Sequence, residues 1–172
     1  MGFFFADKKA QAARALLEPT QSKQATKQLS LLSPDSLNCN NCSLNKAVLQ
    51  HPKMLPTGAK NPIVYVLGEA NGQQEDEDGV QFVGRAGQTL RERIPEEWEP
   101  LIRWNNCIRC RPPSNRDPSQ LELACCRHLQ EEDISSSKPQ AVFGFGNVPL
   151  EWMTGERGIH QWRGRRIPCK IK

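Results

Sequence analysis

The chain has 172 residues and a net charge of +4, which is the size of one domain, since domains usually hold roughly 100–200 residues. Its longest apolar runs, at 64–67 and 141–145, are far shorter than the roughly 20 residues that span a bilayer. The first residues lack the order of charge and apolar run found in signal peptides. We therefore expect a cytoplasmic protein without membrane contact, located in the virion or the host cytoplasm if its source is viral. The small positive charge permits nucleic-acid binding without demonstrating it.

The first 37 residues differ in composition from the rest, being rich in Gln, Ala, Lys and Ser. Apolar residues at helical spacing over 12–17 predict a short helix, and the polar stretch that follows predicts a tether. We expect two parts, an N-terminal helix and tether over 1–37 and a folded domain over 38–172. The N-terminal part is a candidate site for a protein partner.

The remaining sequence alternates between patterns typical of strands and of helices. The expected strands are 63–67, 101–107, 140–146 and one opening at Ile167. Expected helical segments are 87–93, 119–134 with Ser119 as N-cap and Glu122 at the capping-box position, and 148–153. Acidic, polar residues over 73–81 and the prolines over 111–118 predict loops. This alternation predicts an α/β fold, a three-layer α/β/α sandwich around a mostly parallel sheet.

Charge is distributed unevenly along the chain. Residues 69–99 contain nine acidic and three basic side chains, whereas residues 157–172 contain six basic side chains and no acidic one. The C-terminal end is therefore the electropositive part. A solvated face of mixed charge is an equally good interpretation of that end taken alone.

The seven cysteines are the clearest chemical signal. In a reducing compartment they favour metal or cluster ligation over disulfides. Cys39 and Cys42 form a C-x-x-C pair, and Cys110 and Cys126 lie far downstream. Four thiolates can hold zinc or an iron-sulfur cluster, and spacing alone does not decide between them, although the wide second pair suits a cluster better.

Several ordered motifs together resemble the family 4 uracil-DNA glycosylases, the iron-sulfur branch of that superfamily. The matching segments are Gly68-Glu69-Ala70-Asn71-Gly72-Gln73-Gln74-Glu75-Asp76, Phe82-Val83-Gly84-Arg85-Ala86-Gly87-Gln88, the run from Asn106 to Pro118, Ala124-Cys125-Cys126, and the strand and turn over 139–150. The resemblance covers residues 39 to about 168. It implies a 4Fe-4S cluster held by Cys39, Cys42, Cys110 and Cys126, with zinc as the less favoured occupant.

The resemblance also implies a reaction, the removal of uracil from DNA, and a role for each matched residue. Glu69 and the backbone of Ala70 would position the attacking water, and Phe82 would stack on the base. Asn106 would read the base through its amide, whose acceptor and donor can pair with N3–H and O4 of uracil. Further substrate contacts would come from Gly68, Asn71, Gly72, Arg85 and Gln88. Contacts with single-stranded or uracil-containing DNA would come from Arg109, Arg111, Arg116 and Arg163.

Three features depart from the family pattern. Asn71 stands where the family has proline, and the N-terminal segment has no counterpart. The family's His-Pro-Ser motif is absent after residues 164–168, and none of His51, His128 and His160 matches it. Two expectations follow from this absence. One is a truncated or shortened glycosylase, and the other is an impaired family member that serves as a DNA-binding or structural iron-sulfur module in a larger, possibly viral, assembly.

Overall fold

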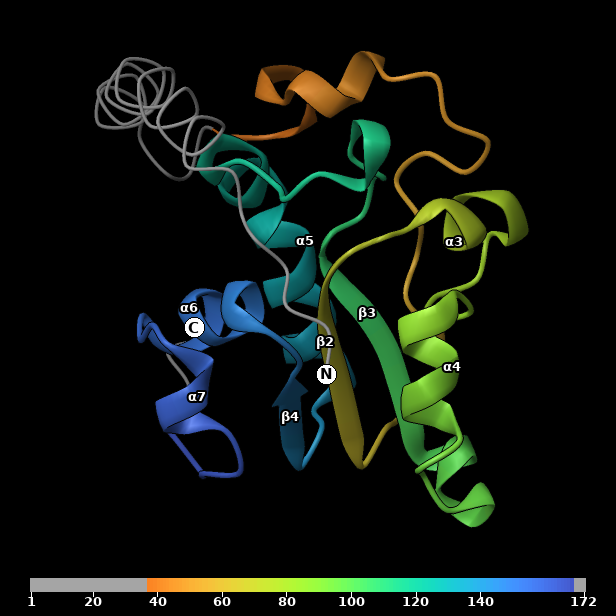
Figure 1. Cartoon of the computed structure of the whole chain (residues 1–172), viewed down its shortest axis with the longest axis vertical. Coiled ribbons are helices and arrows are strands. Elements are labelled where there is room, and N and C mark those ends of the chain that lie inside the picture. The colour runs from red at the N-terminus through yellow and green to blue at the C-terminus, as the bar shows by residue number, and fades with distance from the viewer. Residues whose placement is uncertain (1–36, 169–172) are drawn as a thin grey trace, which may run out of the picture. The chain divides into compact units, whose positions relative to one another are not determined.

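The computed structural model describes residues 37–168. Its four-stranded sheet has the order β1-β3-β2-β4 (Figure 1). The strands are β1 (Thr57–Gly58), β2 (Val64–Ala70), β3 (Ile102–Ile108) and β4 (Ala141–Gly144). β2 pairs in parallel with both β3 and β4, and the short β1 pairs antiparallel with β3. The predicted α/β fold with a mostly parallel sheet is confirmed.

Helices connect these strands and lie beside the sheet. The α-helices are α3 (Gln73–Asp78), α4 (Arg85–Arg91), α5 (Gln120–Ser137), α6 (Asn147–Thr154) and α7 (Ile159–Trp162). Short 3-10 helices are η2 (Cys39–Asn41), η3 (Ser43–Lys46), η4 (Glu96–Leu101) and η5 (Pro113–Asn115). Among the described residues, no helix is long and apolar enough to cross a membrane.

Side chains from alternate positions of the central strands enter two apolar clusters, because successive residues of a strand point to opposite faces. Tyr65 and Leu67 pack in the cluster that includes residues of α5 and α6. Val66 and Trp104 pack in the other, against Leu90 of α4. Helices thus cover both faces of the sheet (Figure 1).

Two sequence predictions about local structure are wrong. The acidic segment 73–81 contains the helix α3 rather than only a loop. Its first-turn acids favour a helix N-terminus, and Glu75 accepts a hydrogen bond from the Gly72 N–H at 3.0 Å. Ile167 does not open a strand. The expected helix at 12–17 lies outside the described residues, and the division of the chain near residue 37 stays a prediction.

Candidate active site

A cleft opens at the carboxyl ends of β2 and β3, the edge at which open parallel sheets bind ligands. Its volume is about 500 Å³. Its lining includes seven of the residues that the sequence singled out: Gly68, Glu69, Ala70, Gly72, Phe82, Arg85 and Asn106. Segments far apart in the sequence therefore meet at one place, and the cleft is large enough for a nucleobase.

Gly68 brings the central side chains of the cleft together. It lies opposite Asn106 in the parallel pairing of β2 with β3. A Cβ atom at this position would lie 2.2 Å from Asn106 Oδ1 and 2.6 Å from Phe82 Cζ. Only glycine leaves room for both side chains, so the close approach of Asn106 and Phe82 depends on it.

Phe82 reaches the cleft from a residue with unusual backbone geometry. Its φ of 57° lies in the left-handed region, which is uncommon for a bulky side chain. Arg91 secures this conformation by donating from Nε to the Phe82 carbonyl at 3.1 Å. The ring packs on Trp104 with the centroids 5.2 Å apart. Phe82 therefore presents a supported aromatic surface to the cleft.

Asn106 is 4% exposed, and its amide nitrogen makes two hydrogen bonds inside the protein. Nδ2 donates to Asn71 Oδ1 at 2.8 Å and to Gln81 Oε1 at 2.7 Å. The structure thus places Asn71 behind Asn106, outside the cleft lining. Asn71 in turn donates to the Arg109 carbonyl at 3.0 Å.

The carboxylate of Glu75 joins the two loops that border the cleft. It accepts from the Gly72 N–H through Oε2 at 3.0 Å and from the Gly84 N–H through Oε1 at 2.7 Å. Gly72 precedes α3 and Gly84 precedes α4. One buried anion therefore satisfies backbone donors at the start of both helices.

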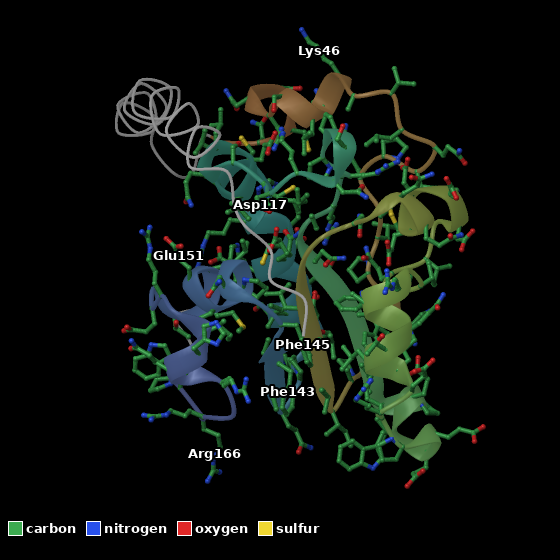
Figure 2. The ribbon with its side chains drawn as sticks, viewed as in Figure 1. Lys46, Asp117, Phe143, Phe145, Glu151 and Arg166 are labelled. Carbon is green, nitrogen blue, oxygen red and sulfur yellow. The ribbon has the colours of Figure 1, made fainter. Side chains whose placement is uncertain are left out.

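Glu69 follows Gly68 on β2 and is half-buried in the cleft. Burial raises the pKa of Glu69 above 4.5, and the negative charge of Asp117 raises it further. Asp117 lies above the carboxyl ends of the strands (Figure 2). A carboxylate with a raised pKa in a cleft is suited to accept a proton from water near neutral pH.

The remaining predicted residues occupy different surroundings. Gln88 is exposed on α4 and donates to the Val83 carbonyl. Arg111 donates to Asn115, which lines the cleft. Arg116 pairs with Glu122, Arg163 is exposed after α7, and Arg109 is buried with one guanidinium nitrogen on the Leu129 carbonyl.

Some residues of the site are missing from the sequence prediction, among them Asn115, Phe145 and Gln81. Asn115 and Phe145 line the cleft, and Gln81 lies fully buried behind it. Phe145 follows β4, so the rule that ligands bind beyond the carboxyl ends of parallel strands would have indicated it. No local signal points to Gln81, because its contact with Asn106 spans 25 positions.

The four predicted cysteine ligands line a second, small cavity between η2, the loop after β3 and the start of α5. Cys125 lines it as well, whereas Cys107 is fully buried in the core. In the part of the chain that the structure describes, no three His, Cys, Asp or Glu side chains converge on one point as a single metal ion requires. The four cysteines line the cavity without meeting at such a point.

Cys126 suits the predicted ligand position better than its neighbour. Burial raises the pKa of the Cys126 thiol, and nearby Cys110, Cys42 and Cys39 raise it further. Burial also raises the pKa of Cys125, but only Cys42 and Cys39 among these thiols contribute to that rise. The other three predicted ligands thus all act electrostatically on Cys126, whereas only two of them act on Cys125. This donor set fits an iron-sulfur cluster.

The comparisons with known proteins agree with this geometry. The family model described as the uracil DNA glycosylase superfamily matches residues 55–169. Among curated relatives, the type-4 uracil-DNA glycosylase of Thermotoga maritima is 37% identical over 108 residues, 62% of this chain and 56% of the relative. That of Pyrobaculum aerophilum is 33% identical over 116 residues, 64% of this chain and 57% of the relative.

A third relative, the type-4 uracil-DNA glycosylase of Sulfurisphaera tokodaii, is 30% identical over 118 residues, which are 63% of this chain and 53% of the relative. The chain therefore spans somewhat more than half the length of the curated relatives it matches. The family resemblance of the sequence motifs is confirmed. From the match over residues 55–169 and these relatives, the chain belongs to the uracil DNA glycosylase superfamily.

Proposed function

We propose that this protein removes uracil from DNA by hydrolysing the N-glycosidic bond. The observation that carries the proposal is the single cleft in which Glu69, Phe82 and Asn106 meet around Gly68. The type-4 uracil-DNA glycosylases among its relatives support it. Nothing in the described residues favours the alternative of an inactive DNA-binding or structural module.

The proposed reaction uses an extruded nucleotide, since a base inside a duplex is out of reach of the cleft. Phe82 stacks on the uracil and Asn106 hydrogen-bonds to it. Water, positioned by Glu69 and the Ala70 backbone, adds to C1′ of the deoxyribose. The bond from C1′ to N1 breaks, its electron pair leaves with the uracil, and the carboxylate of Glu69 takes the proton of the water.

The surroundings of the arginines decide which of them can hold the DNA strand in this proposal. Arg85 and Arg111 lie at or beside the cleft and can reach phosphates. Arg116 is 44% exposed despite its pairing with Glu122, and Arg163 is exposed. Arg109 is 8% exposed, so we assign it to supporting the loop after β3 and not to DNA.

The proposal includes a 4Fe-4S cluster held by Cys39, Cys42, Cys110 and Cys126, which line one cavity. Such a cluster would bind the segment around η2 to β3 and α5, within the expected three-layer sandwich. No step of the reaction passes through it. A cytoplasmic location belongs to the same proposal.

Single-turnover cleavage of a uracil-containing oligonucleotide tests the function. The protein should convert it to an abasic product, and Asn106→Ala should slow this by at least about 100-fold, because the base loses a hydrogen bond made inside a buried site.

Asn105→Ala is the matched control. Asn105 is also a buried asparagine of β3, but it does not line the cleft. Its side chain donates to Tyr65 Oη and accepts from the backbone N–H of Asn106, so it contacts the main chain of Asn106 and not the base-reading amide. The Asn105→Ala variant should retain cleavage at temperatures at which both variants are folded. The function is wrong if the wild-type protein, with its cluster loaded, leaves the oligonucleotide intact.

A further inference from the structure

Three buried amide side chains form a connected chain behind the cleft. Asn71, Gln81 and Asn106 are 2%, 0% and 4% exposed. Asn106 lies at the centre, with its Nδ2 bonded to the side-chain oxygens of the other two. Because an amide side chain has a donor end and an acceptor end, each bond constrains the orientation of the next.

Two backbone carbonyls determine these orientations. Asn71 Nδ2 donates to the Arg109 carbonyl at 3.0 Å, and Gln81 Nε2 donates to the Leu55 carbonyl at 3.3 Å. A carbonyl oxygen only accepts, so turning either amide round would set two oxygens against each other. Asn71 and Gln81 must therefore present oxygen to Asn106.

The orientation of the Asn106 amide is therefore fixed. Both oxygens that face it are acceptors, so both hydrogens of Asn106 Nδ2 are donated within the protein. Asn106 Oδ1 is left on the side of Gly68, where an added Cβ would lie 2.2 Å from it. Gly68 lines the cleft. At this side chain the cleft thus offers an acceptor and no donor.

We propose that Asn71 and Gln81 are positioning residues that set base specificity by holding Asn106 Oδ1 toward the cleft. The inference rests on the proposed function and assigns the selective contact to one atom of the base. Uracil carries a hydrogen on N3 and can donate it to Oδ1. Cytosine has a lone pair at N3 and meets Oδ1 with repulsion. The oxygen O4 of uracil is not read by Asn106.

Gln81→Met tests this inference, with Gln130→Met as its matched control. Both glutamines are fully buried, and both donate from Nε2 to a backbone carbonyl, Gln81 to that of Leu55 and Gln130 to that of Asn106. The control therefore contacts the main chain of Asn106 but not its side-chain amide. The two glutamines differ at the oxygen, because Gln81 Oε1 accepts from the Asn106 side chain whereas Gln130 Oε1 has no hydrogen-bond partner among residues 37–168. A general loss of buried polar contact should affect the two variants alike.

The measurement is the ratio of single-turnover rates on oligonucleotides containing uracil or cytosine. Gln81→Met removes one of the two acceptors that hold the Asn106 amide and leaves only Asn71. The turned amide, which can donate to cytosine N3, becomes more accessible, so the preference for uracil should fall by at least about tenfold. Gln130→Met should keep the wild-type ratio. A ratio unchanged in Gln81→Met, or lowered equally in both variants, overturns the inference.

Hydrogen exchange of the Asn106 side-chain NH₂, followed by NMR in the wild-type protein, provides a readout independent of activity and of folding defects in variants. Both hydrogens should exchange slowly, and Asn71→Leu should accelerate one of them. Rapid exchange of either hydrogen in the wild type overturns the inference. If the wild type cleaves neither base, the proposed function fails, and the exchange result alone decides whether the amide is held.

Discussion

At Glu69 two effects act in the same direction on one carboxyl group. Burial disfavours its charged form, and the negative charge of Asp117 disfavours it again, so the pKa of Glu69 lies above 4.5. Protonated Glu69 cannot accept a proton from water. The proposed reaction should therefore be lost as the pH falls through this raised pKa, and it should be retained above it.

Asp117→Asn tests the electrostatic part of this effect. Removing the charge lowers the pKa of Glu69, so the acid limb of the single-turnover rate should move to lower pH. Glu132→Gln, an equal charge change on the exposed side of α5, should leave the limb in place. An acid limb that is the same in wild type and Asp117→Asn would contradict the influence of Asp117 on the titrating base.

Residues whose role is local could be predicted from the sequence, and residues whose role depends on a distant partner could not. The strand expected over 63–67 is present, although β2 continues through Gly68 to Ala70, so that the turn of the motif around Gly68 begins only at Asn71. Asn71 was expected in the cleft because it belongs to the same motif. Its position behind Asn106 depends on contacts 35 and 38 positions away, which no sequence window contains.

At the scale of single elements, the start of α5 is the best-secured helix end. Ser119 accepts from the Glu122 N–H at 3.3 Å, and Glu122 accepts from the Ser119 N–H at 2.8 Å. Glu122 also accepts from Ser43 of η3 and from Arg116. Burial alone would raise the pKa of Glu122, but these hydrogen bonds lower it to about 2. One carboxylate therefore holds a helix, a loop and a distant turn together.

Ser119→Ala should lower the free energy of unfolding by about 1 kcal/mol, the usual cost of a lost N-cap. Ser136→Ala is a control in the same helix, because Ser136 is exposed near its other end and bonds only to a carbonyl within its own helix. It should change the free energy by less than about 0.5 kcal/mol. Urea denaturation measures the free energy of unfolding of both variants. An equal decrease in the two variants would show that the Ser119 cap does not stabilise the helix.

Elements with a periodic or capping signal were predictable, whereas short ones that depend on tertiary contacts were not. The cap at Ser119, the helix after it and the β-branched run of β2 are present as predicted. β1 has only two residues and exists because β3 lies beside it. In α3 the polarity of the residues indicated a loop, but the Glu75 carboxylate and the left-handed Gly79 stabilise its two ends.

At the scale of the whole described domain, β3 connects the two candidate sites. Asn106 of β3 lines the cleft, and Cys110, just after the strand, lines the cysteine cavity. Arg109 between them accepts from Asn71 through its carbonyl. A cluster bound at the cysteines would thus hold the end of the strand that supports the base-reading residue.

Cys126→Ser and Cys125→Ser test the proposed ligand set with neighbouring residues. We expect Cys126→Ser to lose iron and acid-labile sulfide together with visible absorbance, because it removes a ligand that closes the cluster. Cys125→Ser should retain the iron, the acid-labile sulfide and the visible absorbance. Elemental analysis and the absorption spectrum of protein purified without oxygen provide the measurement. Wild-type protein free of iron would contradict the cluster altogether.

The carboxylate of Glu75 has a consequence for how the cleft admits a base. Since Gly72 and Gly84 donate to the same buried anion, the two bordering loops cannot separate without leaving that charge unpaired. The cleft is thus preformed, and the conformational change that brings the base into it has to occur in the nucleic acid. The rate of uracil capture should then depend on how easily the DNA helix opens around the uracil. Capture should be fastest in single strands, slower where uracil forms a wobble pair with guanine, and slowest where it pairs with adenine.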